Sequence, residues 1–285
     1  MLIYVIEPSI NGLLSAFYLC CKEKRVPARI AYSDWIEVGL EDEVVSVESD
    51  EEKSRRIIDW LENTCGRQKI NLLFTAFDSG RADKCEVILR LLLCVYKYGV
   101  KAFEMKNLQA VAEFDRICAQ VAYEVERLCG FVRFRAVNEI VSSSGRAFEL
   151  LYAVYRSDND VLDRVAGYFA ERNNGIPFVL HDGGREKAAL YNGERIITVP
   201  LKGKVDLVVG DDEALFSSMF KRYFDTVSVS TRKNSRLQRA FLPLRYRDAM
   251  TEFQPEPVFG ETVQKVHKKI TNTNVGTSYS DKERF

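Results

Sequence analysis

The residues between 221 and 247 combine the side-chain types that contact nucleic acids. This stretch carries eight Lys or Arg residues and one acid, Asp225, in a 285-residue chain whose net charge is zero. Guanidinium groups bind phosphates, aromatic rings stack on bases and amides read base edges. The pattern predicts a nucleic-acid interface, and the alternative is a solvated face whose arginines pair with the acidic N-terminal half. The candidate binding residues here are Lys221, Tyr223, Arg232, Asn234, Arg236, Gln238, Arg245 and Tyr246.

Three further arginines lie outside this stretch and have two interpretations each. Arg133 alternates with phenylalanines in a predicted strand, so it faces either solvent or a binding groove. Arg172 ends a predicted helix, where it either caps the helix dipole or joins the interface. Arg185 follows Asp182 across a Gly-Gly turn, so it either staples the loop as an ion pair or presents its guanidinium to an anion.

Candidate catalytic residues are few: His181, Asp182 and Glu252. His181 and Asp182 end a predicted strand, where an imidazole acts as a general base or simply as a hydrogen-bonded histidine of the strand end. Asp182 and Glu252 are the carboxylates that would act as base or metal ligand if the protein is an enzyme. No nucleophile is identifiable beside them, so the sequence leaves open whether any reaction occurs.

Standard cofactor and metal motifs are absent from the sequence. It has no G-x-x-x-x-G-K-[ST], G-x-G-x-x-G, H-E-x-x-H or G-x-S-x-G pattern and no C-x-x-x-C-x-x-C cluster. With two histidines and no C-x-x-C pair, we expect no bound metal and no cofactor. The content of 46% hydrophobic and 29% charged residues excludes a mostly disordered chain, a collagen-like chain and a coiled coil.

The cysteines and the hydropathy pattern bear on the compartment. Seven cysteines without a disulfide framework predict reduced, buried thiols in a cytoplasmic protein. The most apolar stretch, 87–95, is interrupted by Arg90 and is far shorter than the roughly 20 residues of a membrane span. The N-terminus lacks the basic region and cleavage site of a signal peptide. We therefore expect no membrane association.

The elements that must position these residues follow from hydrophobic periodicity and from turn and cap residues. In the first half we predict strands at 2–6 and 44–47, and helices at 10–24, 50–66, 69–77, 82–98 and 108–128, with Asp50 as the N-cap of the second helix. In the second half we predict a hairpin of 131–134 with 148–155 around a turn at 142–145, and a helix capped by Asp158 that runs to 171. Strands are predicted at 176–181, 188–191 and 195–199, the last two joined by an Asn192-Gly193 turn, and a helix is predicted at 211–223. If 234–239 is helical, Arg232, Arg236 and Arg239 lie on neighbouring turns, roughly on one face.

Together these elements predict an α+β fold. A mostly helical N-terminal region follows an opening strand, and a small mixed β-sheet with helices packed on one face follows that region. We predict an N-terminal domain at 1–105, an α+β domain with the basic segment at 106–253, and a polar tail at 254–285.

The sequence between about 122 and 252 resembles a bacterial family of DNA metabolism and DNA repair proteins, whose conserved region is a domain of unknown function. The resemblance rests on the order and spacing of Glu124, Gly130-Phe131-x-Arg133-Phe134, Phe169-x-x-Arg172, Asp182-x-x-Arg185, Ala189-Leu190-Tyr191, Tyr223, Arg232-x-Asn234-x-x-Leu237-Gln238, Pro243-x-Arg245-Tyr246 and Glu252. The chain departs from the family at Tyr168, where relatives usually have histidine, at Arg247, where they have Trp, and at Ile6-Glu7-Pro8, where they have Tyr-Asp-Gly.

The resemblance implies a DNA setting. Some relatives are fused to a uracil-DNA glycosylase-like domain, and family members are typically encoded beside a radical-SAM protein. We therefore expect a DNA-binding repair factor that assists a radical-SAM enzyme. Two alternatives stay open: a glycosylase-like or nuclease-like enzyme with an Asp/Arg/Tyr pocket, and a protein interaction module without DNA affinity. If the histidine replaced by Tyr168 is catalytic in relatives, this protein lacks that activity.

Overall fold

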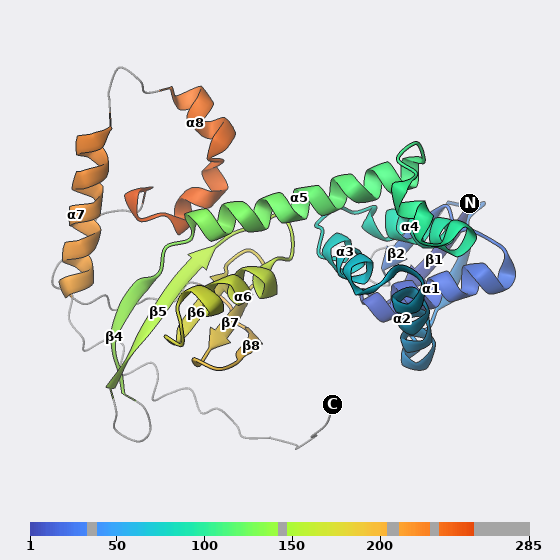
Figure 1. Ribbon diagram of the computed structural model, residues 1–285, viewed down its shortest axis with the longest axis horizontal. Helices are drawn as coiled ribbons and strands as arrows, with labels where there is room; N and C mark the ends of the chain where they lie inside the picture. The colour runs from blue at the N-terminus through green and yellow to red at the C-terminus, as the bar shows by residue number, and fades with distance from the viewer. Residues whose placement is uncertain (33–38, 142–146, 204–210, 229–233, 254–285) are drawn as a thin grey trace.

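The computed structural model describes residues 1–32, 39–141, 147–203, 211–228 and 234–253. Figure 1 shows two groups of elements joined by the long helix α5 (Gln109–Phe131). The predicted turn at 142–145, Arg232 and the predicted tail at 254–285 lie outside the described residues. The fold is α+β, as predicted from the sequence.

The N-terminal body is a three-stranded parallel sheet with helices packed on it. The strand order is β2-β1-β3. Asp50 caps α2 as predicted, because its carboxylate accepts a hydrogen bond from the Lys53 N–H at 2.9 Å. The elements are β1 (Leu2–Ile6), α1 (Ile10–Glu23), β2 (Arg29–Tyr32), β3 (Glu43–Val47), α2 (Glu51–Cys65), α3 (Arg67–Phe77), α4 (Lys84–Tyr98) and the 3-10 helix η1 (Gly99–Glu104).

The second body is a five-stranded mixed sheet of order β4-β5-β6-β7-β8. The β5–β6 pair is parallel, and its crossover is helix α6 (Leu162–Arg172), which packs against β6, β7 and β8. The predicted Asn192-Gly193 turn is confirmed, with Gly193 at φ +100°. The strands are β4 (Arg135–Val141), β5 (Ala147–Tyr155), β6 (Phe178–Asp182), β7 (Lys187–Tyr191) and β8 (Ile196–Pro200).

The C-terminal elements extend away from this sheet. Figure 1 shows α7 (Asp211–Val227) and α8 (Ser235–Phe241) standing apart as two separate helices, which we call the arm. Two 3-10 helices follow, η3 (Leu244–Ala249) and η4 (Thr251–Phe253). The η3 helix packs on α5 and β5, and η4 packs on α7. The arm is therefore joined to the body through η3 and η4, and through the Glu213 carboxylate of α7, which accepts a hydrogen bond from the Ala136 N–H of β4 at 3.3 Å.

Most predicted boundaries differ from the structure by a few residues, and two of the differences bear on residues of the site. The strand predicted at 131–134 is wrong, because α5 continues to Phe131 and the first strand of the sheet starts at Arg135. A four-residue aromatic alternation cannot be distinguished from the last turn of a long helix by its pattern alone. The helix predicted to start at Asp158 starts at Leu162 instead, and Asp158 belongs to the loop before it.

Helix α5 contributes to two hydrophobic cores. Its first half places Val111, Phe114 and Ile117 in the core of the N-terminal body. Its second half places Val121 and Leu128 in the core of the second body. The helix begins just after residue 105 and packs into both bodies at once.

Candidate functional site

A buried carboxylate on α5 holds the second body and the C-terminal elements together. Glu124 accepts hydrogen bonds from the backbone N–H groups of Asp158 at 3.0 Å and Asn159 at 2.9 Å, and from Asn159 Nδ2 at 2.6 Å. The Tyr246 hydroxyl donates a fourth, at 2.8 Å. Because these donors satisfy the charge, the buried carboxylate fixes the loop between β5 and α6 to η3. We call this network the Glu124 anchor.

Tyr246 and Arg245 belong to the anchor. Tyr246 is 1% exposed, and burial together with its hydrogen bond to Glu124 raises its pKa to about 12. Arg245 lies over the Tyr246 ring and pairs with Asp158 at 2.9 Å. The expectation that Tyr246 stacks on exposed bases is therefore corrected, because its ring is enclosed in the core.

The loop that Glu124 holds also contacts the N-terminal body. The Gly80 N–H donates to Asn159 Oδ1 at 2.9 Å, and the Asp160 N–H donates to the Asp78 carbonyl at 2.7 Å. Arg164 Nε pairs with the Asp78 carboxylate at 2.8 Å. The backbone at Gly80 lies so close that an added Cβ would be 2.2 Å from the Asp158 carbonyl oxygen. The loop thus fastens the two bodies beside α5.

Asp182 and Arg185 form an ion pair across the Gly183-Gly184 turn, which is the first of the two interpretations given for Arg185. The fully buried Asp182 carboxylate accepts from the N–H groups of Gly184 at 3.0 Å and Arg185 at 3.3 Å. Arg185 Nη1 lies 3.2 Å from the same carboxylate, and its Nη2 donates to the Asp158 carbonyl at 2.6 Å. Both groups are therefore engaged with each other and with the loop that Glu124 holds.

His181 is a buried, hydrogen-bonded histidine at the end of β6. Its Nδ1 lies 2.7 Å from the Tyr152 hydroxyl, and its Nε2 lies 3.2 Å from the Leu201 carbonyl oxygen. Burial raises the pKa of Tyr152 to about 12, so the phenol stays protonated at neutral pH. Both ring nitrogens of His181 are therefore engaged with groups of the protein itself.

Three further predicted residues, Arg133, Arg172 and Glu252, lie at three separate places in the structure. Arg133 lies in the connection after α5, where it donates to the Gly130 carbonyl at 2.7 Å, so its predicted place on a strand is corrected. Arg172 donates to the Tyr168 hydroxyl at 3.1 Å in the last turn of α6. Glu252 lies in η4, and no hydrogen bond or ion pair of the described chain joins it to Asp182 or His181.

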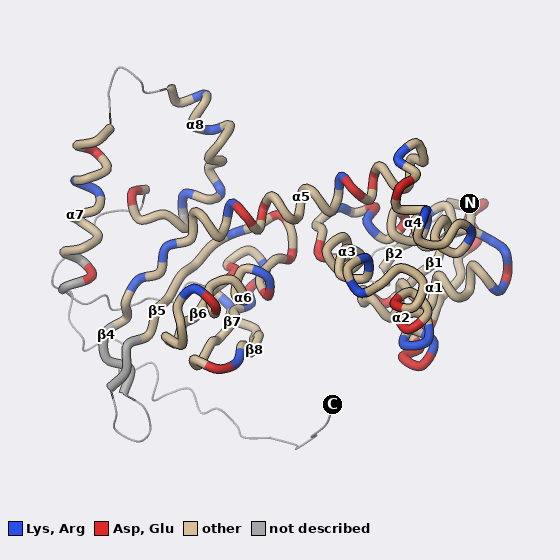
Figure 2. The backbone as a smooth tube through the Cα atoms, viewed as in Figure 1, with Lys and Arg blue, Asp and Glu red and all other residues tan. Residues whose placement is uncertain are grey.

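The arm carries four cations that form no ion pair among the described residues, and the same holds for other Lys and Arg residues elsewhere in the chain. Figure 2 shows Lys and Arg positions along α8 and on α7. Within the described ranges, Lys221, Arg222, Arg236 and Arg239 form no ion pair, whereas Arg245 does. Arg222, Arg236 and Arg239 are exposed, as are the predicted residues Tyr223 and Gln238. Asn234 is the N-cap of α8, since its side-chain oxygen accepts from the Leu237 N–H at 3.0 Å.

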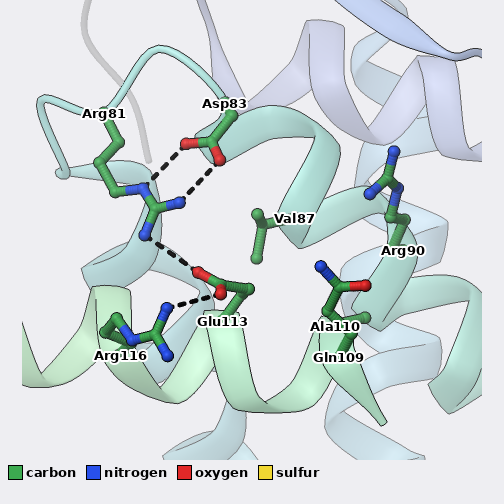
Figure 3. Close-up of a pocket in the computed structure, with 8 residues that line it drawn as sticks. All are labelled: Arg81, Asp83, Val87, Arg90, Gln109, Ala110, Glu113 and Arg116. Atoms are coloured by element: carbon green, nitrogen blue, oxygen red, sulfur yellow. Dashed lines mark hydrogen bonds and ion pairs between the residues drawn. The ribbon is translucent and has the colours of Figure 1, made fainter.

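One cavity of about 370 Å³ lies between α4 and α5 (Figure 3). Arg81 bridges Asp83 at 2.7 Å and Glu113 at 3.2 Å, and Arg116 pairs with Glu113 at 2.6 Å. The lining contains no histidine, cysteine, serine or tyrosine. Its charges are largely paired, so the cavity has no group arranged for nucleophilic or acid–base chemistry.

Among the described residues, no three His, Cys, Asp or Glu side chains gather closely enough to hold a metal ion. In the same part of the chain, no helix has the length and apolar character needed to cross a bilayer.

Comparison with known proteins identifies the region that contains the anchor. A family model described as a domain of unknown function (DUF4130) matches residues 82–252, more than half of the chain. The chain belongs to this family. The DUF4130 region includes α4 and α5, so it begins well before the motifs of the sequence resemblance, and it includes the Glu124 anchor and both helices of the arm. No curated protein matches the chain.

Two features of the site were missed from the sequence. The loop at 158–160 joins Glu124, Arg185 and Arg245 through its backbone and side chains, and only capping was predicted there. The exposed phenylalanines of α7 were not selected either. Their spacing along the helix was a usable signal, but exposure cannot be read from spacing alone.

Proposed function

We propose that this DUF4130 protein binds nucleic acid, DNA first, through the arm. The observation that supports the proposal is the group of arm cations, Lys221, Arg222, Arg236 and Arg239, which have no acidic partner among the described residues. Arg222, Arg236 and Arg239 are exposed, so their guanidinium groups can contact phosphates. The alternative that these arginines merely pair with the N-terminal half finds no support among the described contacts.

The role that fits the proposal best is that of an accessory factor in DNA metabolism or repair. The resemblance to DNA repair proteins encoded beside a radical-SAM protein supports a radical-SAM repair or modification enzyme as the partner, in the cytoplasm. The engaged states of Asp182 and His181 also favour a factor that delivers DNA over one that carries out the reaction itself. In this proposal the partner enzyme carries out the reaction, and the arm binds the DNA on which that enzyme acts.

A second candidate is a protein interaction module. The exposed aliphatic side chains of Leu215 and Met219 on α7 favour it, since exposed apolar surface marks protein interfaces. In that case the protein co-purifies with a protein partner and shows no affinity for DNA.

Fluorescence anisotropy with labelled DNA, titrated across a salt series, tests the proposal. The variants are Arg236→Ala/Arg239→Ala in the arm and Arg55→Ala/Arg56→Ala as the control, since the latter pair is exposed on α2. Each phosphate neutralised on a duplex contributes about 0.9 to the slope of log K against log salt concentration. We expect the arm variant to lower this slope by up to about 1.8 and to weaken binding, while the control changes neither. Negligible binding of the wild-type protein to every DNA tested would refute the proposal.

A further inference from the structure

We infer that α7 pairs with α7 of a second copy of this chain, as two antiparallel helices related by a two-fold axis. The contact surface is an exposed apolar stripe along α7, which we call the α7 stripe. This inference goes beyond the proposed function and does not depend on it, because the stripe contains no cation. The stripe consists of Leu215, Phe216, Met219, Phe220, Tyr223 and Val227.

The α7 stripe faces away from the rest of the described structure. Helix α7 contacts the body through another side, where Glu213 accepts from the Ala136 N–H at 3.3 Å and the Phe224 ring packs edge-on against Phe253. At about 100° per residue, Glu213 and Phe224 lie within about 20° of each other around the helix. The stripe covers about 140° beside them. Its side chains are 40–66% exposed, and Phe220, the nearest to the body side, is exposed least. Figure 1 shows α7 at the outer edge of the molecule, where another helix can reach it.

The spacing of the stripe indicates that its occupant is a helix. Phe216, Phe220, Tyr223 and Val227 follow one another at intervals of four, three and four residues. This is the spacing of the core positions with which one helix packs lengthwise on another. An apolar residue also flanks this seam near each of its first two positions, at Leu215 and Met219.

No charged residue interrupts the stripe along the described residues 215–227. The charged residues of this part of α7 are Lys221, Arg222 and Asp225, and each lies about 120° or more around the helix from Phe216. Contacts between copies of one chain are more apolar than other protein interfaces, and charges are depleted from their cores. The composition of the stripe therefore fits a second copy of the chain, and the cations of α7 remain outside the contact.

The α7 stripe is complementary to itself when its direction is reversed. A two-fold axis between positions 219 and 220 places Phe216 opposite Tyr223 of the second copy, and Met219 opposite Phe220 of the second copy. Both pairs are favourable, since aromatic rings pack on each other and a thioether packs on an aromatic ring. The antiparallel direction also places the opposite ends of the two helix dipoles side by side. This match favours a second copy over an unrelated helix.

The α7 stripe is large enough for a stable dimer. On a scale of roughly 150–250 Å² for a large side chain, the half-exposed side chains of the stripe offer roughly 500–700 Å² in each copy. Two copies then remove roughly 1,000–1,400 Å² from water, and a specific interface needs roughly 1,000 Å². Interfaces of about this size have dissociation constants in the micromolar range or below. We therefore expect the dimer to form at ordinary protein concentrations.

Sedimentation of the full chain without DNA, from about 1 to about 100 μM, measures the pairing. Phe216→Asp/Tyr223→Asp places charges in the seam, and Phe216→Ala/Tyr223→Ala removes both rings while keeping good helix formers. Tyr123→Asp is the matched control, because it places the same charge at an exposed tyrosine of α5. All these side chains are exposed, so thermal melting of each variant should show a folded body.

We expect the wild type and Tyr123→Asp to form dimers, and both seam variants to raise the dissociation constant about 100-fold or more. A wild type that stays monomeric up to about 100 μM overturns the inference and leaves the stripe to a different protein. A dimer that both seam variants keep at wild-type affinity overturns it as well. Because no DNA is present, loss of the proposed function would not alter these results, and loss of the dimer would not refute DNA binding.

Cysteine cross-linking tests the antiparallel direction. Met219→Cys lies beside the proposed two-fold axis, so oxidation should join two copies through this position. Thr226→Cys lies on the same side of α7, but its equivalent in the second copy would be about 20 Å away along the helix. We expect a cross-linked dimer for Met219→Cys and none for Thr226→Cys above the wild-type background of native cysteines. Equal cross-linking at both positions indicates a parallel pair and overturns the proposed arrangement.

Discussion

The Tyr246 hydroxyl donates a 2.8 Å hydrogen bond to the Glu124 carboxylate across 122 residues of sequence. This contact links η3, which follows the arm, to the helix that both hydrophobic cores share. Arg245 and the loop at 158–159 complete the network around it. The motif Pro243-x-Arg245-Tyr246 thus fixes the base of the arm, and the arm presents other side chains to solvent.

Replacing Tyr246 by Phe should destabilise the protein by about 1–3 kcal/mol. The change removes one hydroxyl and leaves a buried carboxylate one donor short, and an unsatisfied buried charged group costs about that much. Urea denaturation measures the loss as a shift in midpoint. Tyr123→Phe is the matched control, because its hydroxyl bonds to Arg127 on the exposed surface of α5. Equal, small shifts for the two variants would show that the anchor contributes nothing to stability.

Replacing Gly80 by Ala should destabilise strongly, by about 2 kcal/mol or more, because the new Cβ would lie 2.2 Å from the Asp158 carbonyl oxygen. Backbone must move to relieve such a contact, and that movement would break the hydrogen bonds of the loop at 158–160. Gly130→Ala is the contrasting change. A Cβ at Gly130 in α5 meets nothing within 4 Å, so this variant should gain about 0.5–1 kcal/mol. Thermal melting of both variants tests the pair, and a neutral Gly80→Ala contradicts the close approach.

Asp182→Asn should lower stability by about 1–3 kcal/mol without changing DNA affinity at equal folded fraction. The carboxylate accepts two backbone N–H bonds and pairs with Arg185, so the amide leaves a guanidinium without its charge partner. Chemical denaturation and the anisotropy assay are run on the same preparation. Asp225→Asn, on the exposed part of α7, is the control for stability. A stable Asp182→Asn protein that loses an activity toward DNA would return Asp182 to the catalytic candidates.

The buried thiols should resist alkylation at neutral pH. Burial raises the pKa of Cys20 and of Cys118 to about 12, so near pH 8 only about one thiol in 10⁴ is in the reactive thiolate form. Since the shift is upward, reactivity in the folded protein should rise as pH rises toward 12 and fall below it. Mass spectrometry after iodoacetamide treatment, with and without urea, measures both sites. Rapid labelling of Cys118 in the folded protein at pH 8 would contradict its burial.

Local signals in the sequence predicted most of the elements. Asp50 and Asn192-Gly193 were recognised because a cap and a hairpin turn are set by neighbouring residues. The strand β2 was missed because four residues, Arg29–Tyr32, are too few for a pattern and are stabilised by parallel pairing with β1. The strand predicted at 131–134 was wrong because this segment is also only four residues long, and tertiary contacts decide that α5 continues to Phe131.

The candidate site was predictable in its residue types but not in their roles. Glu124, Asp182, Arg185, Arg245 and Tyr246 are all in motifs that the sequence singled out, yet the structure gathers them around one loop as buried or paired groups. The residue type alone does not distinguish an arginine or tyrosine of the core from one on a binding surface. Arg245 differs from Arg236 because it pairs with Asp158, a residue from a distant part of the chain that the local sequence does not reveal.

The sharing of α5 by two cores has a consequence for how the chain can be divided. A cut just before Gln109 would strip Val111, Phe114 and Ile117 from the first core, and a cut at the middle of the helix would split one continuous hydrogen-bonded ladder. Neither half would then keep all of its apolar surface covered. The two bodies should therefore melt in one cooperative transition, and a fragment that begins or ends within this helix should be prone to aggregation.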